Sequence, residues 1–192
     1  FNANDSYWLS NPAAPLVGYS PLHGFERVPQ SARTHMNLKL LTEMGAKGAS
    51  GEDGKFTIEE LQAAMMGNRS YTAELLRDQV VARCKSSPTV EVDMVPIDLK
   101  AACGVLAAWD GRFNPDSAGA VLWREFLGSF SSAAVEDRGA LMSVAFDPDQ
   151  PLDTPNTLNE PPPKGEQDKV MAALARAQIR LNDAGFALAV PL

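Results

Sequence analysis

The sequence predicts a mainly α-helical chain of about six helices, with short strand pieces at its two ends. Apolar residues make up 45% and charged residues 21% of the 192 positions, a composition typical of folded globular proteins. Apolar side chains recur at steps of three and four residues in several stretches, which is the spacing of one helix face. Glycine and proline clusters separate these stretches and indicate the turns between helices.

The chain divides into four parts. Residues 1–30 contain several prolines and are expected to be extended and to lie over another surface. Residues 31–146 form the helical region, and residues 147–163, with six prolines, are expected to be a surface loop. Residues 164–192 should form a last helix followed by a returning apolar strand.

The helices carry start and stop signals. Ser31 is expected to cap the first helix, and Thr57 with Glu60 forms a capping box, in which the hydroxyl and the carboxylate each satisfy a backbone N–H. Gly185 should end the last helix. The predicted helices span approximately residues 31–45, 57–66, 70–85, 101–109, 115–130 and 164–183.

Charge and hydropathy exclude two classes of protein. With 17 Lys and Arg against 24 Asp and Glu, the net charge of −7 repels phosphate, and no basic patch offsets it. A nucleic-acid partner is therefore not expected. The longest uninterrupted apolar stretch, Ala101–Trp109, has nine residues, half of the ~18 that a membrane-spanning helix needs.

The two ends of the sequence look unfinished. The chain opens on Phe1 and Asn2, without Met or an apolar signal core, and it closes on the apolar run 187–192 without a polar cap. We therefore expect a processed subunit or an excised piece of a longer polypeptide.

The two cysteines leave two alternatives open. Cys84 lies near the end of one predicted helix and Cys103 near the start of the next. If these helices pack antiparallel, both thiols fall at the same end of the pair, where a disulfide is geometrically feasible and would imply an oxidising compartment. The alternative is that both thiols are small buried hydrophobic groups.

The glycine-rich loop before residue 57 carries part of a calcium-binding pattern. Asp53, Gly54 and Glu60 match the second half of an EF-hand loop, but Ala49 and Gly51 stand where two further oxygen ligands are needed. A flexible loop followed by a capped helix is the favoured interpretation, and a calcium-responsive helical module is the weaker one.

The two histidines do not predict a metal site. His23 and His35 have no Cys, Asp or Glu at offsets that would complete a set of ligands, so a structural role is favoured for both. These residues therefore give no reason to expect a metal.

The opening segment concentrates polar side chains. Asn2 and Asn4 can form a turn in which their side chains bond their own backbone. Alternatively, an asparagine carboxamide can serve as a fixed N–H donor to an oxyanion that develops during a reaction. The residues alone favour the turn.

The same segment resembles a known family. Residues 2–12, with the sequence N-A-N-D-S-Y-W-L-S-N-P, are similar to an internal stretch of the β subunit of penicillin-acylase-type enzymes, especially the acyl-homoserine lactone acylases. Residues 31–34, 107–112 and 123–126 support this resemblance, which extends over roughly residues 1–130.

The resemblance implies a fold and a catalytic site. The family consists of N-terminal nucleophile hydrolases with an αββα core, whose precursor is cleaved to expose a serine that attacks an amide carbonyl. Asn4 matches the oxyanion-hole asparagine, with Asn2 as the fallback, and Arg33 matches the arginine that orients it. Because Phe1 is no nucleophile, the serine is expected outside this chain, which should be inactive by itself.

The resemblance also implies substrate, partners and location. The parent enzyme would hydrolyse the amide bond of small N-acyl compounds, such as acyl-homoserine lactones or penicillin-like amides, without a metal or an organic cofactor. Its remaining β-subunit segment and its α subunit, from the same precursor, would be the partners, in the bacterial periplasm or outside the cell. The alternative from another class is a non-catalytic helical binding module.

Overall fold

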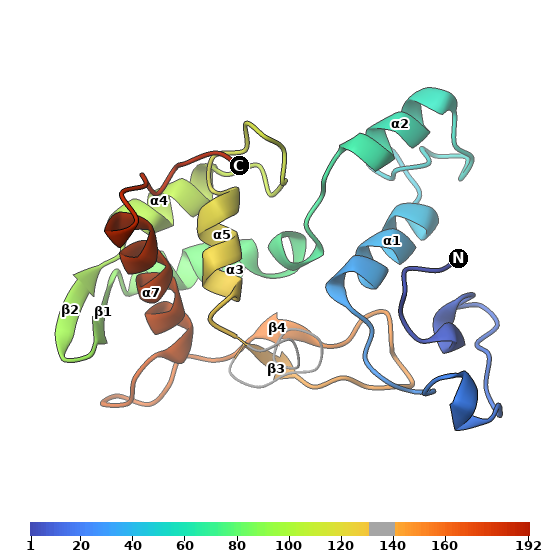
Figure 1. Ribbon diagram of the computed structural model, residues 1–192, viewed down its shortest axis with the longest axis horizontal. Coiled ribbons are helices and arrows are strands. Elements are labelled where there is room, and N and C mark those ends of the chain that lie inside the picture. The colour runs from blue at the N-terminus through green and yellow to red at the C-terminus, as the bar shows by residue number, and fades with distance from the viewer. Residues whose placement is uncertain (131–140) are drawn as a thin grey trace.

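The computed structural model describes residues 1–130 and 141–192, and six helices lie in these two ranges, as the sequence predicts. Two short 3-10 helices precede them, and two small antiparallel pairs of strands interrupt them (Figure 1). The elements are η1 (Tyr7–Leu9), η2 (Pro21–His23), α1 (Ala32–Thr42), α2 (Ile58–Met66), α3 (Tyr71–Ser86), β1 (Thr89–Val92), β2 (Val95–Asp98), α4 (Lys100–Ala108), α5 (Ala120–Leu127), β3 (Met142–Val144), β4 (Asn156–Leu158) and α7 (Lys169–Asp183).

Four helices and one hairpin form the main body. Helices α3, α4, α5 and α7 pack on one another, and the hairpin β1–β2 packs on α7. The N-terminal segment, α1 and α2 lie on the other side of the molecule, where α1 contacts α3 (Figure 1). The N-terminal segment therefore reaches the main body mainly through α1.

The main body has a continuous hydrophobic core with an aromatic row at its centre. Trp123 lies between Trp109 and Phe126, with ring centroids 5.8 and 5.1 Å away, and all three side chains are buried. Its indole N–H donates to the hydroxyl of Thr72 at 3.1 Å, so the polar atom of this buried ring is satisfied. Burial of each such side chain contributes about 1.5–3 kcal/mol to the stability of the fold, so this core supports the elements that pack on it.

The two cysteines are bonded to each other. Cys84 of α3 and Cys103 of α4 form a disulfide with a Cα–Cα distance of 5.8 Å, and both residues are buried. The bridge closes the segment that contains β1 and β2 and ties α3 to α4. Of the two alternatives that the sequence left open, the structure contains the disulfide.

The strands are not at the ends of the chain, where the sequence placed them. Residues 1–30 form 3-10 helices and turns, and residues 186–192 form no strand. Apolar composition alone does not make a strand, because a strand needs a neighbouring backbone to accept and donate its hydrogen bonds. Within the described ranges, the C-terminal run has no such neighbour, whereas β4 forms inside the predicted loop 147–163 because it pairs with β3.

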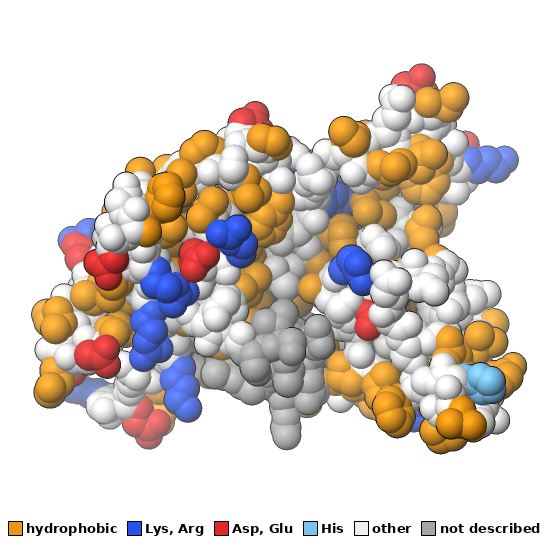
Figure 2. Space-filling model, in the orientation of Figure 1, with side chains coloured by type: hydrophobic (Ala, Val, Ile, Leu, Met, Phe, Trp, Pro, Cys, Tyr) orange, Lys and Arg blue, Asp and Glu red, His pale blue; other side chains and the backbone are white. Residues whose placement is uncertain are grey.

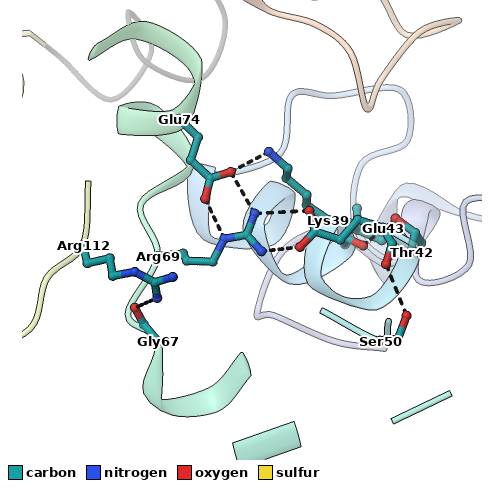
Figure 3. A network of polar contacts seen from close by, with 9 residues as sticks. Lys39, Thr42, Glu43, Ser50, Gly67, Arg69, Glu74 and Arg112 are labelled. Atoms are coloured by element: carbon teal, nitrogen blue, oxygen red, sulfur yellow. Dashed lines mark hydrogen bonds and ion pairs between the residues drawn. The ribbon is translucent and has the colours of Figure 1, made fainter. Parts of the chain in front are cut away.

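An ion cluster holds the end of α1 against the start of α3 (Figure 3). The guanidinium of Arg69 donates to both carboxylate oxygens of Glu74, at 2.6 and 2.9 Å, and also pairs with the carboxylate of Glu43. Lys39 donates to Glu74 as well, at 2.5 Å. Burial raises the pKa of Glu74, but the hydrogen bonds from Arg69 and Lys39 outweigh it and leave this pKa below its ordinary value. The carboxylate is therefore charged at neutral pH.

A ring stack makes a second contact between α1 and α3. The rings of His35 and Tyr71 lie 4.8 Å apart and are inclined by only 14°. His35 is 4% exposed, and its Nε2 has no hydrogen-bond partner in the described part of the chain. Burial lowers the pKa of His35 and outweighs the opposite effects of a backbone hydrogen bond with Leu152 and of nearby carboxylates. The imidazole is therefore neutral at pH 7.

Replacement of Arg69 should loosen α1. We expect Arg69→Met to lower the free energy of unfolding by about 1–3 kcal/mol, because it leaves two half-buried carboxylates without their shared donor. Denaturant unfolding followed by circular dichroism measures this loss. Arg124→Met is the matched control, since Arg124 pairs with Glu125 at an exposed site, and it should cost no more than about 1 kcal/mol. Equal losses in the two variants would contradict the role of the cluster.

His35 should make the protein less stable in mild acid. Because its folded pKa lies below the ordinary value of 6.5, the unfolded chain binds the proton more readily. Its contribution to stability is therefore complete above pH 6.5 and is lost as the pH falls through the folded pKa. In unfolding measurements from pH 7.5 to 5.0, His35→Phe should have a flatter pH dependence than the wild type. A wild-type slope in His35→Phe would contradict this role of the buried imidazole.

Candidate functional site

The N-terminal segment presents Asn4 at the tip of a tight turn. Asn4 has a φ of 62°, in the left-handed region that asparagine adopts more readily than most residues. Its backbone N–H donates to Oδ1 of Asn2 at 2.7 Å, which is an Asx turn. The side chain of Asn2 thus supports the turn, while the exposed carboxamide of Asn4 makes no hydrogen bond within the described ranges.

The first turn of α1 clamps the residues on both sides of Asn4. Arg33 donates through Nη2 to the carbonyl oxygen of Ala3. On the other side, Oδ2 of Asp5 accepts from the backbone N–H and the hydroxyl of Ser31, at 2.9 and 2.6 Å, and from the hydroxyl of Thr34. The structure therefore brings Asn2, Asn4 and Arg33 together, and Arg33 contacts the peptide before Asn4 rather than its side chain.

The N-terminus of α1 explains why the clamp forms here. Ser31 is the N-cap, and its hydroxyl oxygen accepts from the N–H of Thr34 at 3.3 Å. A helix N-terminus favours an anion, because its first N–H groups have no partner in the helix. Burial raises the pKa of Asp5, but the hydrogen bonds from Ser31 and Thr34 and the charge of Arg33 outweigh it. The pKa of Asp5 is therefore lowered, and its carboxylate stays charged.

A second carboxylate organises the rest of the segment. Glu26 accepts from the hydroxyl of Tyr7 at 2.7 Å and from the N–H groups of Gly18 and Tyr19 at 2.9 and 2.8 Å. The hydrogen bond from Tyr7, together with the two from the backbone, lowers the pKa of Glu26. Glu26 thus resembles Asp5 in its number of donors, but it does not bond to residues 3–5.

An apolar cavity of about 540 Å³ lies between α1 and α2, beside Arg33. Its walls are mostly aliphatic and aromatic, and Phe56 and Phe113 contribute rings to them. Along α2, Ile58, Met65 and Met66 are more than two-thirds exposed. Figure 2 shows hydrophobic side chains gathered over this helix, so this side of the molecule offers apolar surface to a small apolar group or to another polypeptide.

The carboxylates of the EF-hand-like loop serve the backbone. Glu60 accepts from the N–H of Thr57 at 2.8 Å, and the hydroxyl of Thr57 accepts from the N–H of Glu60 at 3.1 Å, which confirms the capping box. Asp53 accepts from the N–H of Lys55 at 2.9 Å. In residues 1–130 and 141–192, no group of three or more His, Cys, Asp or Glu is arranged to hold a metal ion.

The two histidines lie in different environments. His23 is at the exposed end of η2, and His35 is buried between α1 and α3.

Among the described helices, none is long and apolar enough to cross a membrane.

The sequence did not single out Asp5 or Thr34 as parts of the site. Ser31 was predicted as a helix cap, but its second role, as a donor to Asp5, links positions 26 residues apart in the sequence. Periodicity and capping signals describe neighbours within one element and do not identify contacts of this kind.

Comparisons with known proteins agree with the resemblance. The chain matches the family model of penicillin amidase over residues 1–189. It is 46% identical to an aculeacin-A acylase of Actinoplanes utahensis over 128 residues, which cover 66% of this chain and 16% of that protein. It is 33% identical to the acyl-homoserine lactone acylase PvdQ of Pseudomonas savastanoi pv. phaseolicola over 183 residues, which cover 95% of this chain and 21% of that protein.

A further relative is the acyl-homoserine lactone acylase PvdQ of Pseudomonas fluorescens, 30% identical over 179 residues, which cover 93% of this chain and 21% of that protein. The chain thus spans 16–21% of the length of these relatives. Since the family model matches nearly every residue, this chain belongs to the penicillin amidase family.

Proposed function

We propose that this chain is part of an acylase that hydrolyses the amide bond of N-acyl compounds, and that Asn4 supplies one hydrogen bond of its oxyanion hole. The observation that carries the proposal is the clamped turn, in which α1 holds the residues on both sides of an exposed carboxamide. Membership of the penicillin amidase family and relatives named as acylases support the reaction class. Acyl-homoserine lactones or penicillin-like amides are the proposed substrates.

The chemistry of the carboxamide suits this role. When a nucleophile attacks an amide carbonyl, the carbonyl oxygen becomes negatively charged, and an N–H that already points at it stabilises that charge without reorganisation. Asn4 has Nδ2 available for this contact, whereas Asn2 uses its side-chain oxygen to hold the turn. We therefore assign the oxyanion contact to Asn4 and a supporting role to Asn2, with Nδ2 of Asn2 as the fallback donor. Arg33 orients the site through the carbonyl of Ala3.

The attacking group belongs to another part of the protein in this proposal. An N-terminal serine outside this chain attacks the carbonyl, with its own α-amino group as base and without metal or cofactor. The chain then works together with the remaining β-subunit segment and the α subunit of one precursor, inside a larger αββα fold. A periplasmic or secreted location accords with the disulfide between Cys84 and Cys103, since disulfides persist in oxidising compartments.

The proposal is tested by removal of the carboxamide. In the complete acylase, we expect Asn4→Ala to lower kcat about 10²–10³-fold, which corresponds to about 2.7–4 kcal/mol of transition-state stabilisation. KM should change little, because the contact strengthens only as the oxyanion forms. Release of the free amine from N-acyl-homoserine lactones and from penicillin-type amides measures the reaction and also identifies the preferred substrate.

Asn11→Ala is the matched control. Asn11 is an exposed asparagine of the same segment that also forms an Asx turn, with Oδ1 accepting from the N–H of Ala13 at 3.1 Å. This variant should keep the wild-type kcat, and the 192-residue chain alone should hydrolyse nothing. Wild-type kcat in Asn4→Ala would contradict the assignment. A complete protein without amidase activity would favour a non-catalytic binding module instead.

A further inference from the structure

We infer that Asp5 is a positioning residue for the reaction, which holds the carboxamide of Asn4 in place from the N-terminus of α1. This inference rests on the proposed function of Asn4. Asp5 directly follows Asn4 in the chain, and one of its carboxylate oxygens, Oδ2, accepts all three hydrogen bonds that α1 gives it. These contacts lie directly after Asn4, one residue before Ser6, whose hydroxyl donates to the carbonyl oxygen of Phe25.

The turn requires such a contact. Asparagine enters the left-handed region more readily than most residues but does not stay there by itself, so the contacts around Asn4 are what hold its φ of 62°. Asn2 bonds the N–H of Asn4, and Arg33 bonds the carbonyl of Ala3, but both act before the Cα atom of Asn4. Asp5 is the first anchor after it and the one that ties the turn to α1. With one side released, the carboxamide would sample several directions.

The donors to Asp5 come from a rigid part of the molecule. Thr34 is 2% exposed, and Ser31 caps the helix that the ion cluster and the ring stack hold on α3. Opposite charges also stand on the two sides of the turn, with Arg33 before Asn4 and Asp5 after it. The carboxylate therefore transmits the position of α1 to the Asn4 turn, although it does not itself touch the substrate.

The experiment is a double-mutant cycle in the complete acylase. Asp5→Asn keeps the shape of the side chain but removes its charge, and Asn4→Ala removes the group that Asp5 positions. In the otherwise wild-type enzyme, we expect Asp5→Asn to lower kcat about 10–100-fold, because it displaces the carboxamide of Asn4 from the reacting oxygen. KM should change little. In the Asn4→Ala background, the same substitution should lower kcat less than about threefold, because the positioned group is already absent.

Glu26→Gln is the matched control for the loss of a carboxylate. Glu26 also accepts three hydrogen bonds in the same segment, two of them from backbone N–H groups, but it does not bond to residues 3–5. Its replacement should lower the unfolding temperature without a change in kcat. If Glu26→Gln and Asp5→Asn lower kcat alike, the role of Asp5 is only structural and the inference is overturned.

The remaining outcomes are equally decisive. An equal loss of kcat from Asp5→Asn in both backgrounds overturns the inference but leaves the role of Asn4 intact. Wild-type kcat in Asn4→Ala overturns the proposed function and this inference with it. If Asp5→Asn does not fold, Thr34→Val takes its place in the cycle, because it removes one donor to Asp5 and keeps the shape of a buried side chain. A smaller loss of kcat that disappears in the Asn4→Ala background supports the inference.

Discussion

The attachment of α1 to α3 is the constraint on which the candidate site depends. An isolated helix of 11 residues is marginal in water, so the position of α1 comes from its tertiary contacts. The Arg69 cluster fixes the end of α1, the stack of His35 on Tyr71 holds its first half, and its N-terminal residues carry the clamp for Asn4. The main core, centred on the Trp123 ring, holds α3. A perturbation anywhere along this series of contacts is expected to reach the Asn4 turn.

Two carboxylates on this route show the same balance of forces. Burial alone would raise the pKa of both Asp5 and Glu74, but the hydrogen bonds that they accept outweigh burial and lower it. Each is thus a charged group that is partly withdrawn from water and accepts three hydrogen bonds. A carboxylate of this kind holds its donors strongly, because loss of either partner leaves an unsatisfied polar group in a poorly hydrated place. This explains how a few polar contacts help to fix α1 on α3.

The sequence predicted the helices better than the strands. Apolar spacing and caps such as Ser31 and Thr57 are local signals, and all six helices were found from them. Helix α5 starts later than predicted because Gly119 adopts a φ of 116°, at a point where a Cβ atom would lie 2.8 Å from that of Trp109. The hairpin was missed because its turn residues, Asp93 and Met94, include no glycine, although both have positive φ.

The candidate site was only partly accessible to sequence reasoning. The resemblance identified Asn4 and Arg33, whereas the bonds of Asp5 to α1 depend on tertiary structure and have no local signal. The sequence also set two interpretations against each other, an Asx turn and an oxyanion donor. The structure shows that they are compatible, because the turn uses the side chain of Asn2 and the backbone of Asn4. A turn built in this way leaves the second carboxamide exposed and holds its backbone still, which is the arrangement that a preorganised donor requires.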